Sequence, residues 1–475
     1  MHAPKYPLAA SAAFPFRARA VTDPEPAPRL AGPRLDRLPV CRFHWRLLGL
    51  IGAGLFVDAL DLYIQGAVLA ELVRTGESTA SGNATFLSMT FAGLTLGSLS
   101  GGWLADRFGR RRLYQLNLLV FGLATLAAAF APDFGALLAC RFVAGLGLGA
   151  EVITAYGTLT EFVPARERGV WQGRLSALSN LGLPVSALMA WVLIPRFGWR
   201  SLFAVVGVLS FVVWFTRKYM PESPRWYESR NRHVEAEATL RDIESEVERL
   251  TGSRLDPVTA GAVAPEAGFP ARALFRGPMA RRMTLAITLM VAMNFTLYAF
   301  TGWFPTILVQ KGVPIARTLL ITTLVQLGSL PGAFLGAWVM DRFGRKTALI
   351  AISTLGAVVS ATYSSIDQPA ALVAIGFLLV ALIYCLLAIT YGAYVPEIFP
   401  TTVRLTGFGF SNAAGRLSNV IAPYGVALLL RAYGAGAVYV AIAGALVVQA
   451  MAVAWMGEET RRRSLEDIAR TPSSG

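Results

Sequence analysis

Long apolar segments separated by short polar turns fill most of the chain. Twelve of them come close to or exceed the roughly 20 residues that a helix needs to cross a bilayer core of about 30 Å. They lie near residues 47–72, 84–105, 113–131, 135–162, 170–194, 200–218, 283–308, 315–340, 347–365, 369–396, 403–430 and 434–456. The pattern predicts an all-α membrane protein with twelve transmembrane helices.

A short motif occurs twice and divides these helices into two groups. Residues 101–111 read Gly-Gly-Trp-Leu-Ala-Asp-Arg-Phe-Gly-Arg-Arg, and residues 336–346 read Gly-Ala-Trp-Val-Met-Asp-Arg-Phe-Gly-Arg-Lys. Each copy lies between two apolar segments, where a charged turn fits only if the loop leaves the bilayer. Two copies in register predict two six-helix pseudo-symmetric halves, which build transporters far more often than enzymes.

Between the halves the sequence becomes polar and charged. A helix-breaking run at 221–226 and a mixed-charge stretch near 232–250 predict a cytoplasmic linker with an amphipathic helix. The expected organisation is a disordered cytoplasmic tail over 1–45, six-helix bundles over 46–218 and 283–457, the linker over 219–282, and a cytoplasmic tail over 458–475.

The composition agrees with a membrane protein. With 55% hydrophobic residues, 15% charged residues and a mean hydropathy of +0.52, the chain has too few charges to cover a soluble surface. Its net charge of +14 would suit nucleic acid, but most Lys and Arg residues lie in the tails, the linker and alternate loops. The opposite loops hold only Arg74, Arg196, Arg200, Lys311, Arg317 and Arg431. This asymmetry predicts cytoplasmic termini and linker, a plasma membrane or bacterial inner membrane location, and no nucleic-acid partner.

The sequence offers little that an enzyme would need. Its three cysteines and three histidines form no readable disulfide framework or metal site. No nucleophile triad or phosphate-binding loop is recognisable. We therefore expect no enzymatic activity and no cofactor, and a monomer whose partners are a small-molecule substrate, protons and the lipid bilayer.

The duplicated loop resembles the best-known motif of the major facilitator superfamily, and the resemblance extends over residues 46–468. Stretches 161–169, 221–225, 396–404 and 459–466 are similar to signatures of its sugar-porter and metabolite:proton symporter branches. The resemblance implies the major facilitator fold, with the duplicated loop as a cytoplasmic latch that favours the outward-open state. The latch residues so implied are Gly102, Asp106, Arg107, Gly109, Arg110, Asp341, Arg342, Gly344 and Arg345.

Two helices separate this chain from typical sugar porters. Residues 294–306, in the seventh helix, lack the Gln-Gln pair and paired tyrosines of sugar porters. They end in Trp-Phe-Pro-Thr, which resembles aromatic-acid and nicotinate-type symporters. The first helix agrees, because Asp58 and Asp61 resemble the Asp-x-x-Asp pair of those symporters. The resemblance implies that the substrate is a small organic anion, such as an aromatic or other carboxylate.

Charged residues at membrane depth are costly unless they are paired or hydrated, so each is a functional candidate. Asp58 and Asp61 lie on one side of the first helix, and Arg141 in the fourth helix reaches a similar depth. In the related family an arginine at this place is tied to proton coupling. A proton on Asp61 would release Arg141, and an anionic substrate could then replace the carboxylate. The alternative is a static ion pair that holds two helices together.

Polar residues in the second half predict a substrate site. Arg416 lies at mid-depth in the eleventh helix, with Asn412 and Asn419 on the same face, and a planar guanidinium suits a carboxylate. Alternatively Arg416 reaches the inner interface or pairs with the tenth helix. The other substrate-binding candidates, each of which could instead make an interhelical hydrogen bond, are Asn294, Tyr298, Thr301, Gln326 and Tyr384.

The inner ends of the helices carry a third set of charges. Glu161 and Glu397 each lie near a proline and an arginine and resemble paired salt-bridge elements of the two halves. The inner-gate candidates are Glu151, Glu161, Arg168, Glu397 and Arg404. The leading hypothesis is a proton-coupled symporter that imports a small organic anion by alternating access. A sugar or polyol:proton symporter, a metabolite or drug exporter, and a transporter-like membrane sensor are the alternatives.

Overall fold

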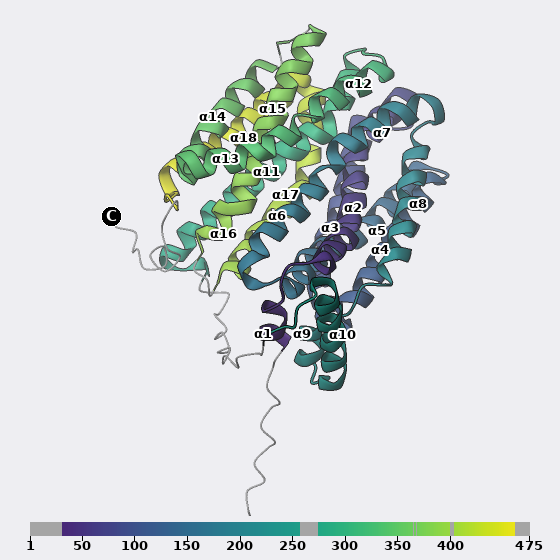
Figure 1. Cartoon of the computed structure of the whole chain (residues 1–475). Coiled ribbons are helices and arrows are strands. Elements are labelled where there is room, and N and C mark those ends of the chain that lie inside the picture. Colours follow the sequence, from purple (N-terminus) through teal and green to yellow (C-terminus); the bar gives the residue numbers. More distant parts are fainter. Residues whose placement is uncertain (1–30, 257–273, 364, 367, 400–402, 461–475) are drawn as a thin grey trace, which may run out of the picture.

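The computed structural model describes residues 31–256, 274–363, 365, 366, 368–399 and 403–460. Within these ranges the chain forms two bundles of long helices that lie side by side (Figure 1). The side chains of four predicted site residues lie outside this description, namely Gly102, Asp106, Asp341 and Arg404. The roles expected for them stay predictions.

The first bundle contains six spans, and the fifth span is broken. Its helices are α2 (Arg42–Thr75), α3 (Ala80–Phe108), α4 (Arg110–Ala129), α5 (Phe134–Phe162), α6 (Arg168–Asn180) continued by α7 (Gly182–Phe197), and α8 (Arg200–Arg217). The break after α6 lies next to Gly182, where a Cβ atom would come within 2.5 Å of the Ala59 Cβ. The glycine therefore lets α7 pack directly against α2.

The second bundle repeats this order with two broken spans. Its helices are α11 (Gly277–Gln310), α12 (Ile315–Gln326) with α13 (Ser329–Phe343), α14 (Arg345–Tyr363), α15 (Pro369–Ile389) with the π-helix η3 (Thr390–Tyr394) and α16 (Val395–Glu397), α17 (Arg404–Tyr433) and α18 (Ala435–Met456). A π-turn inside a helix shifts the side chains that follow it, and such turns are frequent at functional sites.

Eleven of the spans in the described chain are long and apolar enough to cross a membrane. The twelfth, α3, is 29 residues long but rich in Gly, Ser and Thr. These small residues allow close packing on α5: a Cβ on Gly97 would lie 2.1 Å from the Leu146 carbonyl oxygen. Gly332 on α13 is placed in the same way, 2.2 Å from the Ala381 carbonyl oxygen. The expected all-α membrane fold with twelve helices in two halves is confirmed.

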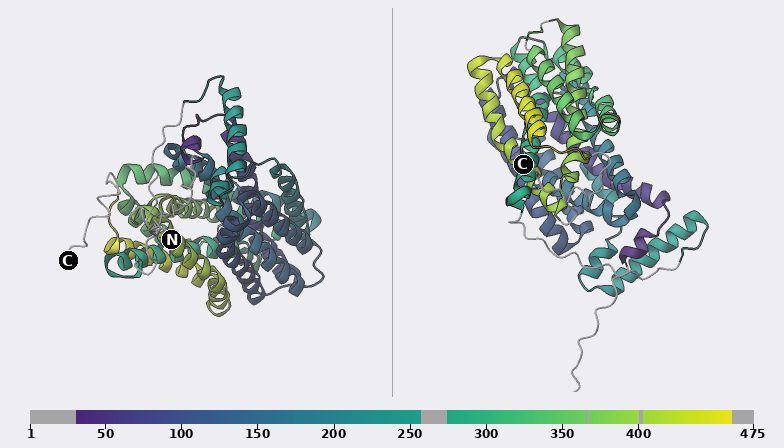
Figure 2. Two further views of the ribbon diagram at one scale, coloured as in Figure 1. Left: turned by 90° about the horizontal axis from the view of Figure 1, so that it is seen from below. Right: turned by 90° about the vertical axis from the view of Figure 1, so that its left-hand side faces the viewer.

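Three helices outside the transmembrane spans gather at one end of the bundle, which we call the linker end; the opposite end is the far end (Figures 1 and 2). They are α1 (Ala31–Asp36), α9 (Pro224–Ser229) and α10 (His233–Thr251), and η1 (Ala165–Glu167) precedes α6. The amphipathic helix expected near 232–250 is therefore present as α10. Its buried side chains recur at helical spacing, which gives it one apolar face: Ala236, Leu240, Ile243 and Val247.

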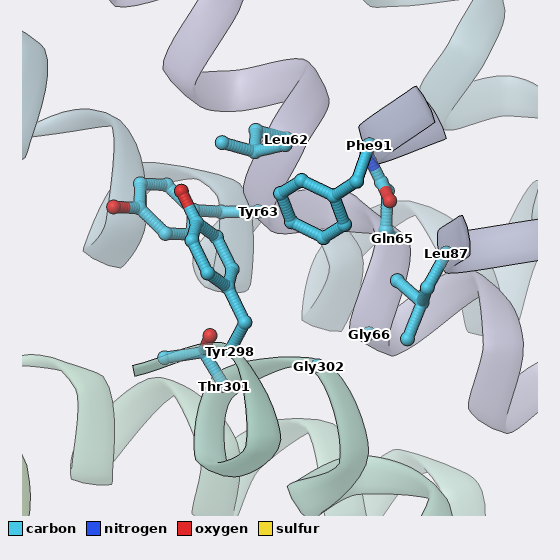
Figure 3. A pocket seen from close by; sticks show the side chains of 9 residues that line it. All are labelled: Leu62, Tyr63, Gln65, Gly66, Leu87, Phe91, Tyr298, Thr301 and Gly302. Atoms are coloured by element: carbon cyan, nitrogen blue, oxygen red, sulfur yellow. The ribbon is translucent and has the colours of Figure 1, made fainter. Parts of the chain in front are cut away.

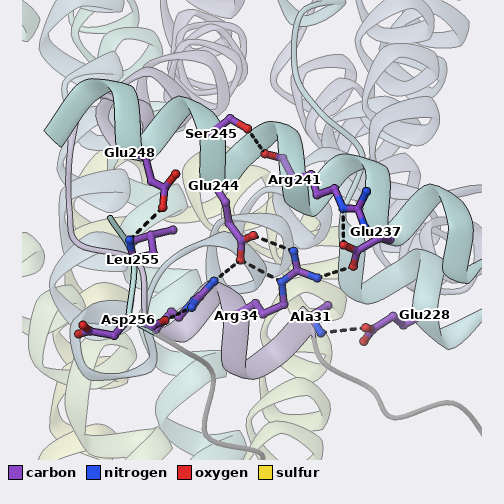
Figure 4. Close-up of polar contacts among 11 residues, drawn as sticks. Ala31, Arg34, Glu228, Glu237, Arg241, Glu244, Ser245, Glu248, Leu255 and Asp256 are labelled. Carbon is purple, nitrogen blue, oxygen red and sulfur yellow. Dashed lines mark hydrogen bonds and ion pairs between the residues drawn. The ribbon is translucent and has the colours of Figure 1, made fainter. Parts of the chain in front are cut away.

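The expectation of disorder over residues 1–45 is wrong for the part of that stretch that the structure describes. Arg34 donates to Glu244 at 2.7 and 2.9 Å and also pairs with Glu237, and Arg37 pairs with Glu244 at 2.7 Å (Figure 4). Glu228 accepts a 2.8 Å hydrogen bond from the backbone N–H of Ala31. These contacts dock α1 on α9 and α10; we call them the clasp. Sequence periodicity missed α1 because it is too short to show a pattern.

Candidate functional site

Two small adjoining cavities lie between the halves, and each has free room for about one water molecule. Both are lined by Leu87 and Phe91 of α3 and by Tyr298 of α11. The first also contacts Tyr63 of α2 and Thr301, as Figure 3 shows. The rings of Phe91 and Tyr298 meet edge to face at 4.7 Å, so the cavities have aromatic walls.

A cluster of amides and a hydroxyl lies beside these cavities. Asn294 donates to Tyr391 Oη at 2.5 Å and accepts from Asn419 Nδ2 at 3.0 Å. Three elements of the second half meet here, because Asn294 lies on α11, Tyr391 in η3 and Asn419 on α17. The π-turn brings Tyr391 to Asn294. The sequence analysis missed Tyr391, although its place seven residues after Tyr384 was an available signal.

Arg416 lies at the boundary between the halves. Its guanidinium donates to the Ser98 hydroxyl of α3, across from its own helix α17. The titratable groups nearest to it in the described structure are the phenols of Tyr298 and Tyr391, and it forms no ion pair with a described carboxylate. Of the two alternatives suggested by the sequence, proximity to the tenth helix is seen at Tyr391 of η3, and no ion pair with that helix is formed among the described residues.

Only some of the other predicted substrate residues lie at the two cavities. Tyr298 and Thr301 line the first cavity. Tyr384 donates to the Tyr63 hydroxyl at 3.0 Å, which joins α15 to α2 across the halves. Gln326, at the end of α12, and Asn412, one turn before Arg416, line neither of the two cavities.

Asp61 and Arg141 form the ion pair expected from the sequence. Arg141 Nη1 donates to Asp61 Oδ1 at 2.9 Å, the second Nη pairs with Oδ2, and the Thr125 hydroxyl donates to Oδ1 at 3.3 Å. Both charged side chains are fully buried. The rings of Phe86 and Phe203 cover the guanidinium at 5.6 and 5.2 Å. A bidentate, desolvated pair of this kind is strong only while both partners keep their charges.

A second buried pair lies nearer the linker end, because Glu151 follows Arg141 on α5 by ten residues, about three helical turns. Glu151 of α5 pairs with Arg217 of α8, and Arg217 also donates to the carbonyls of Leu50 and Ile51 at 3.0 Å. Gly54 makes room, because a Cβ there would lie 1.7 Å from the guanidinium. The sequence predicts Glu151 at the inner gate, whereas the structure places it in this membrane-depth pair. Arg217 was missed because it stands at the end of an apolar segment and resembles a loop charge.

Asp58 is close to this second pair and not to Arg141. Its carboxylate is 5% exposed and neither oxygen has a hydrogen-bond partner among the described residues. The charges that act on it belong to Glu151, Arg217 and Asp61. Three carboxyl groups thus lie near the two guanidiniums of Arg141 and Arg217, so one of the three has no positive partner of its own among the described residues.

The latch loops and predicted gate residues form matching ion pairs in the two halves. Arg110 pairs with Glu161 at 2.9 Å, and Arg345 pairs with Glu397 at 3.3 Å. Arg168 does not join Glu161 but pairs with Asp36 of α1 at 3.0 Å. Both glutamates therefore form salt bridges, with latch arginines as their partners, and their role at an inner gate stays a prediction.

Each latch turn is also capped by a carboxylate that follows the sixth helix of its own half. Glu222 accepts from the backbone N–H of Arg110 at 2.9 Å, and Glu459 accepts from that of Arg345 at 2.9 Å. The turn glycines have φ values of +97° and +91°, which other residues rarely adopt. Burial raises the pKa of the Glu222 carboxyl, although backbone hydrogen bonds work in the opposite direction. The carboxylates sit where the positive ends of α4 and α14 favour them.

The two remaining latch arginines, Arg107 and Arg342, each lie over the ring of a tryptophan of the preceding helix turn. Arg107 lies over the ring of Trp103 at 5.4 Å, and Arg342 lies over that of Trp338 at 5.7 Å. Each tryptophan is more than half exposed. The two loops therefore repeat in cap, ion pair and stacking, as the duplicated sequence predicts.

Comparison with known proteins agrees with this geometry. Residues 59–471 match the family model described as sugar (and other) transporter. The chain is 39% identical to the inner membrane metabolite transport protein YdjE of Escherichia coli, over 92% of this chain and 98% of that protein. It is 32% identical to the niacin transporter NiaP of Acinetobacter baylyi (92% and 98% covered) and 29% identical to the 4-hydroxybenzoate transporter PcaK of Pseudomonas putida (83% and 88%).

A solved structure shares the fold. The xylose transporter XylE of Escherichia coli superposes with a TM-score of 0.70 at 18% identity, covering 89% of this chain and 100% of that one. The relatives are transporters and not enzymes, and the chain is accordingly a multi-pass membrane transporter of small molecules. It belongs to the sugar (and other) transporter family of the major facilitator superfamily.

Proposed function

We propose that the protein transports a small organic anion together with protons by alternating access. Arg416 carries this proposal. An intramembrane guanidinium is costly without a counter-charge, and Arg416 has no described carboxylate as its partner. It lies where the two halves meet, next to Tyr298, Tyr391 and the Ser98 hydroxyl. An anionic substrate would supply the missing negative charge.

The surroundings of Arg416 support a carboxylic acid with a flat ring. Phe91 and Tyr298 offer aromatic walls, and Asn294 and Asn419 offer amides beside them. Niacin and 4-hydroxybenzoate, named in the titles of two relatives, are aromatic carboxylic acids. Recognition of a carboxylate by arginine next to apolar walls suits both compounds.

Proton coupling follows from the charge imbalance in the first half. Asp58, Asp61 and Glu151 lie near only two guanidiniums, so one carboxyl group at membrane depth lacks a positive partner of its own among the described residues. Two buried carboxylates that share one arginine favour uptake of a proton by one of them. Loss of that proton would change the ion pairs of α2 with α5 and α8, which gives the proton a mechanical effect on the first half.

Contacts between the halves indicate which end is closed. At the far end, Asn83 of α3 donates to Thr306 of α11 at 3.5 Å, and Ser88 donates to the Val420 carbonyl at 2.7 Å. A Cβ on Gly66 would lie 2.7 Å from the Thr301 carbonyl oxygen, so α2 and α11 touch there. We infer that this conformation admits substrate from the linker end, and we assign that end to the cytoplasm because basic residues are concentrated there.

Uptake by proteoliposomes with an inside-alkaline pH gradient tests the proposal. We expect labelled nicotinate or 4-hydroxybenzoate to accumulate, and xylose not to. Arg416→Gln should abolish acid uptake, and Arg416→Lys should raise KM about tenfold or more, because Lys keeps the charge but loses the planar fork. Accumulation of xylose, or equal behaviour of the Gln and Lys variants, would contradict the anion site.

A further inference from the structure

Gln65 of α2 is a buried amide with no hydrogen-bond partner. It is 1% exposed, and among the described residues it is the buried amide for which neither Oε1 nor Nε2 has a partner. Buried polar groups in proteins are nearly always paired. Asn294, Asn419 and Asn83 follow this rule, since each donates to a neighbour. The exception indicates that the partner of Gln65 comes from outside the chain.

The amide lies at the wall of the first cavity. Figure 3 shows Gln65 beside Phe91 and Leu87, with the rings of Tyr63 and Tyr298 across the cavity. In this conformation the cavity has room for about one water molecule, so a ring compound would bind here only after the halves move apart. Just beyond Gln65, Gly66 touches the α11 backbone at Thr301. Gln65 therefore stands next to the contact that closes the cavity toward the far end.

Of the three hydroxyls that line the cavity with Gln65, those of Thr301 and Tyr63 are used by other partners, whereas that of Tyr298 makes no hydrogen bond among the described residues. The Thr301 hydroxyl donates to the Leu297 carbonyl of its own helix at 2.7 Å. The Tyr63 hydroxyl accepts from Tyr384 at 3.0 Å. The other neighbours are apolar or glycine, namely Leu62, Gly66, Leu87, Phe91 and Gly302. An interhelical hydrogen bond, the usual role of a polar residue in a membrane bundle, is thus not made by Gln65 here.

The positions of Gln65 and Arg416 indicate how a substrate would lie. Tyr298 lines the cavity of Gln65, and it also lies within electrostatic range of Arg416 and Tyr63. A ring stacked along Tyr298 and Phe91 could reach both groups. A primary amide donates and accepts, so it suits a ring nitrogen, a hydroxyl or an amino group.

We propose that Gln65 binds a second polar group of the substrate, on the opposite side of the ring from the carboxylate that Arg416 holds. The inference rests on the proposed function and narrows its substrate class to ring monocarboxylates with a polar ring atom or substituent. Gln65 is then the residue that distinguishes these acids from unsubstituted ones. A site with a buried amide rejects an analogue that leaves the amide unpaired.

Binding of three acids to purified protein tests the role of Gln65. Benzoate has no second polar group, whereas nicotinate has a ring nitrogen and 4-hydroxybenzoate a hydroxyl. We expect wild-type protein to bind at least one of the latter two about tenfold or more tightly than benzoate. Gln65→Leu should remove this preference and change the Kd for benzoate less than about threefold, and Gln65→Asn should keep part of it.

A matched control is Gln449→Leu, which removes a buried amide of α18 that bonds Ser353 at 3.2 Å. It should leave the preference intact. If wild-type protein prefers a polar acid and Gln65→Leu or Gln65→Asn keeps the full preference, Gln65 does not contact the substrate, and the proposed anion site stands. If wild-type protein binds all three acids equally, the inference is also wrong. If it binds none of them, the proposed function itself fails.

Discussion

At the scale of single residues, the buried carboxyl groups of the first half differ in how they are paired, and so in how much stability their removal costs. Asp61 is held by a bidentate arginine and a threonine hydroxyl, whereas Asp58 has no hydrogen-bond partner among the described residues. Removing one partner of a satisfied ion pair leaves the other partner charged and buried. Removing a surplus charge has no such cost. Two carboxylates that look alike in the sequence should therefore respond differently to substitution.

Asp58→Asn should fold normally and lose proton-driven accumulation, while exchange of substrate down its gradient continues. Asp61→Asn should instead destabilise the protein by about 3–5 kcal/mol, because Arg141 loses its counter-charge. Thermal unfolding in detergent and a comparison of accumulation with exchange in proteoliposomes measure both effects. An Asp58→Asn variant that still accumulates substrate against its gradient would place the coupling proton elsewhere.

The latch turns make a second prediction at this scale. Gly109→Ala introduces a Cβ at φ +97°, 2.4 Å from the Glu222 carboxylate, so it should cost about 1–3 kcal/mol and weaken the cap of α4. Gly157→Ala on α5 is the control, because a Cβ there meets nothing within 4 Å. It should be neutral or stabilising. Equal melting temperatures for the two variants would argue against a strained turn at Gly109.

At the scale of helices, the clasp shows how α1 is held by charge. The side chain of Arg34 is 11% exposed and contacts two glutamates of α10. Arg241, which lies on α10 itself and pairs with Glu237, is 73% exposed. Burial favours the neutral carboxyl of Glu244, but hydrogen bonds from Arg34 and Arg37 outweigh it, and the net pKa is below the usual value. The clasp therefore depends on an ionised Glu244.

Arg34→Ala should release α1 and lower its docking stability by about 1 kcal/mol, and Arg241→Ala should change it by less than about half of that. A lowered carboxyl pKa adds stability above the unfolded value near 4.5, and this stability is lost as pH falls through the lower folded pKa. Hydrogen exchange of residues 31–36 reports both effects. Protection that is unchanged in Arg34→Ala, or that does not decline as pH is lowered from 4.5 until the carboxyls are fully protonated, would show that apolar packing alone holds α1.

The helices also show what sequence patterns can and cannot predict. Periodicity and length located all twelve spans and α10, because these elements bury long apolar faces. They missed α1, which six residues cannot reveal, and the breaks at Leu181 and Gly328. Counting residues along each helix correctly predicted that Asp61 lies at the depth of Arg141. The same count could not predict that Asp58 lies near Glu151 and Arg217 instead. The sequence did not indicate Gln65 as a site residue. A single amide in an apolar segment usually forms an interhelical hydrogen bond, and only its neighbours in the structure show that this one does not.

At the scale of the whole molecule, closure of the far end depends on a glycine. Gly66 lets α2 meet the α11 backbone, and a Cβ there would lie 2.7 Å from the Thr301 oxygen. Gly66→Leu should prevent this closure and favour the conformation that is open at the far end. Gly49→Leu on the same helix, with nothing within 4 Å, should not.

Labelling of a cysteine introduced at Thr301 measures this shift. A reagent that cannot cross the membrane, added on the far side, should react faster in the Gly66→Leu background than in the Gly49→Leu background. Transport should fall in Gly66→Leu, because one half of the cycle is no longer reached. Equal labelling in both backgrounds would show that the far-end contact does not govern access.

The caps of the latch turns bear on how the protein is made. Glu222 and Glu459 each follow the sixth span of the half they serve, so neither half borrows a cap from the other. The turn at Gly109, its cap and the clasp all lie within residues 31–256. During synthesis the first half can therefore complete its own network before α11 leaves the ribosome. We therefore expect each half to fold as a separate unit, and two halves translated as separate chains should assemble in one membrane.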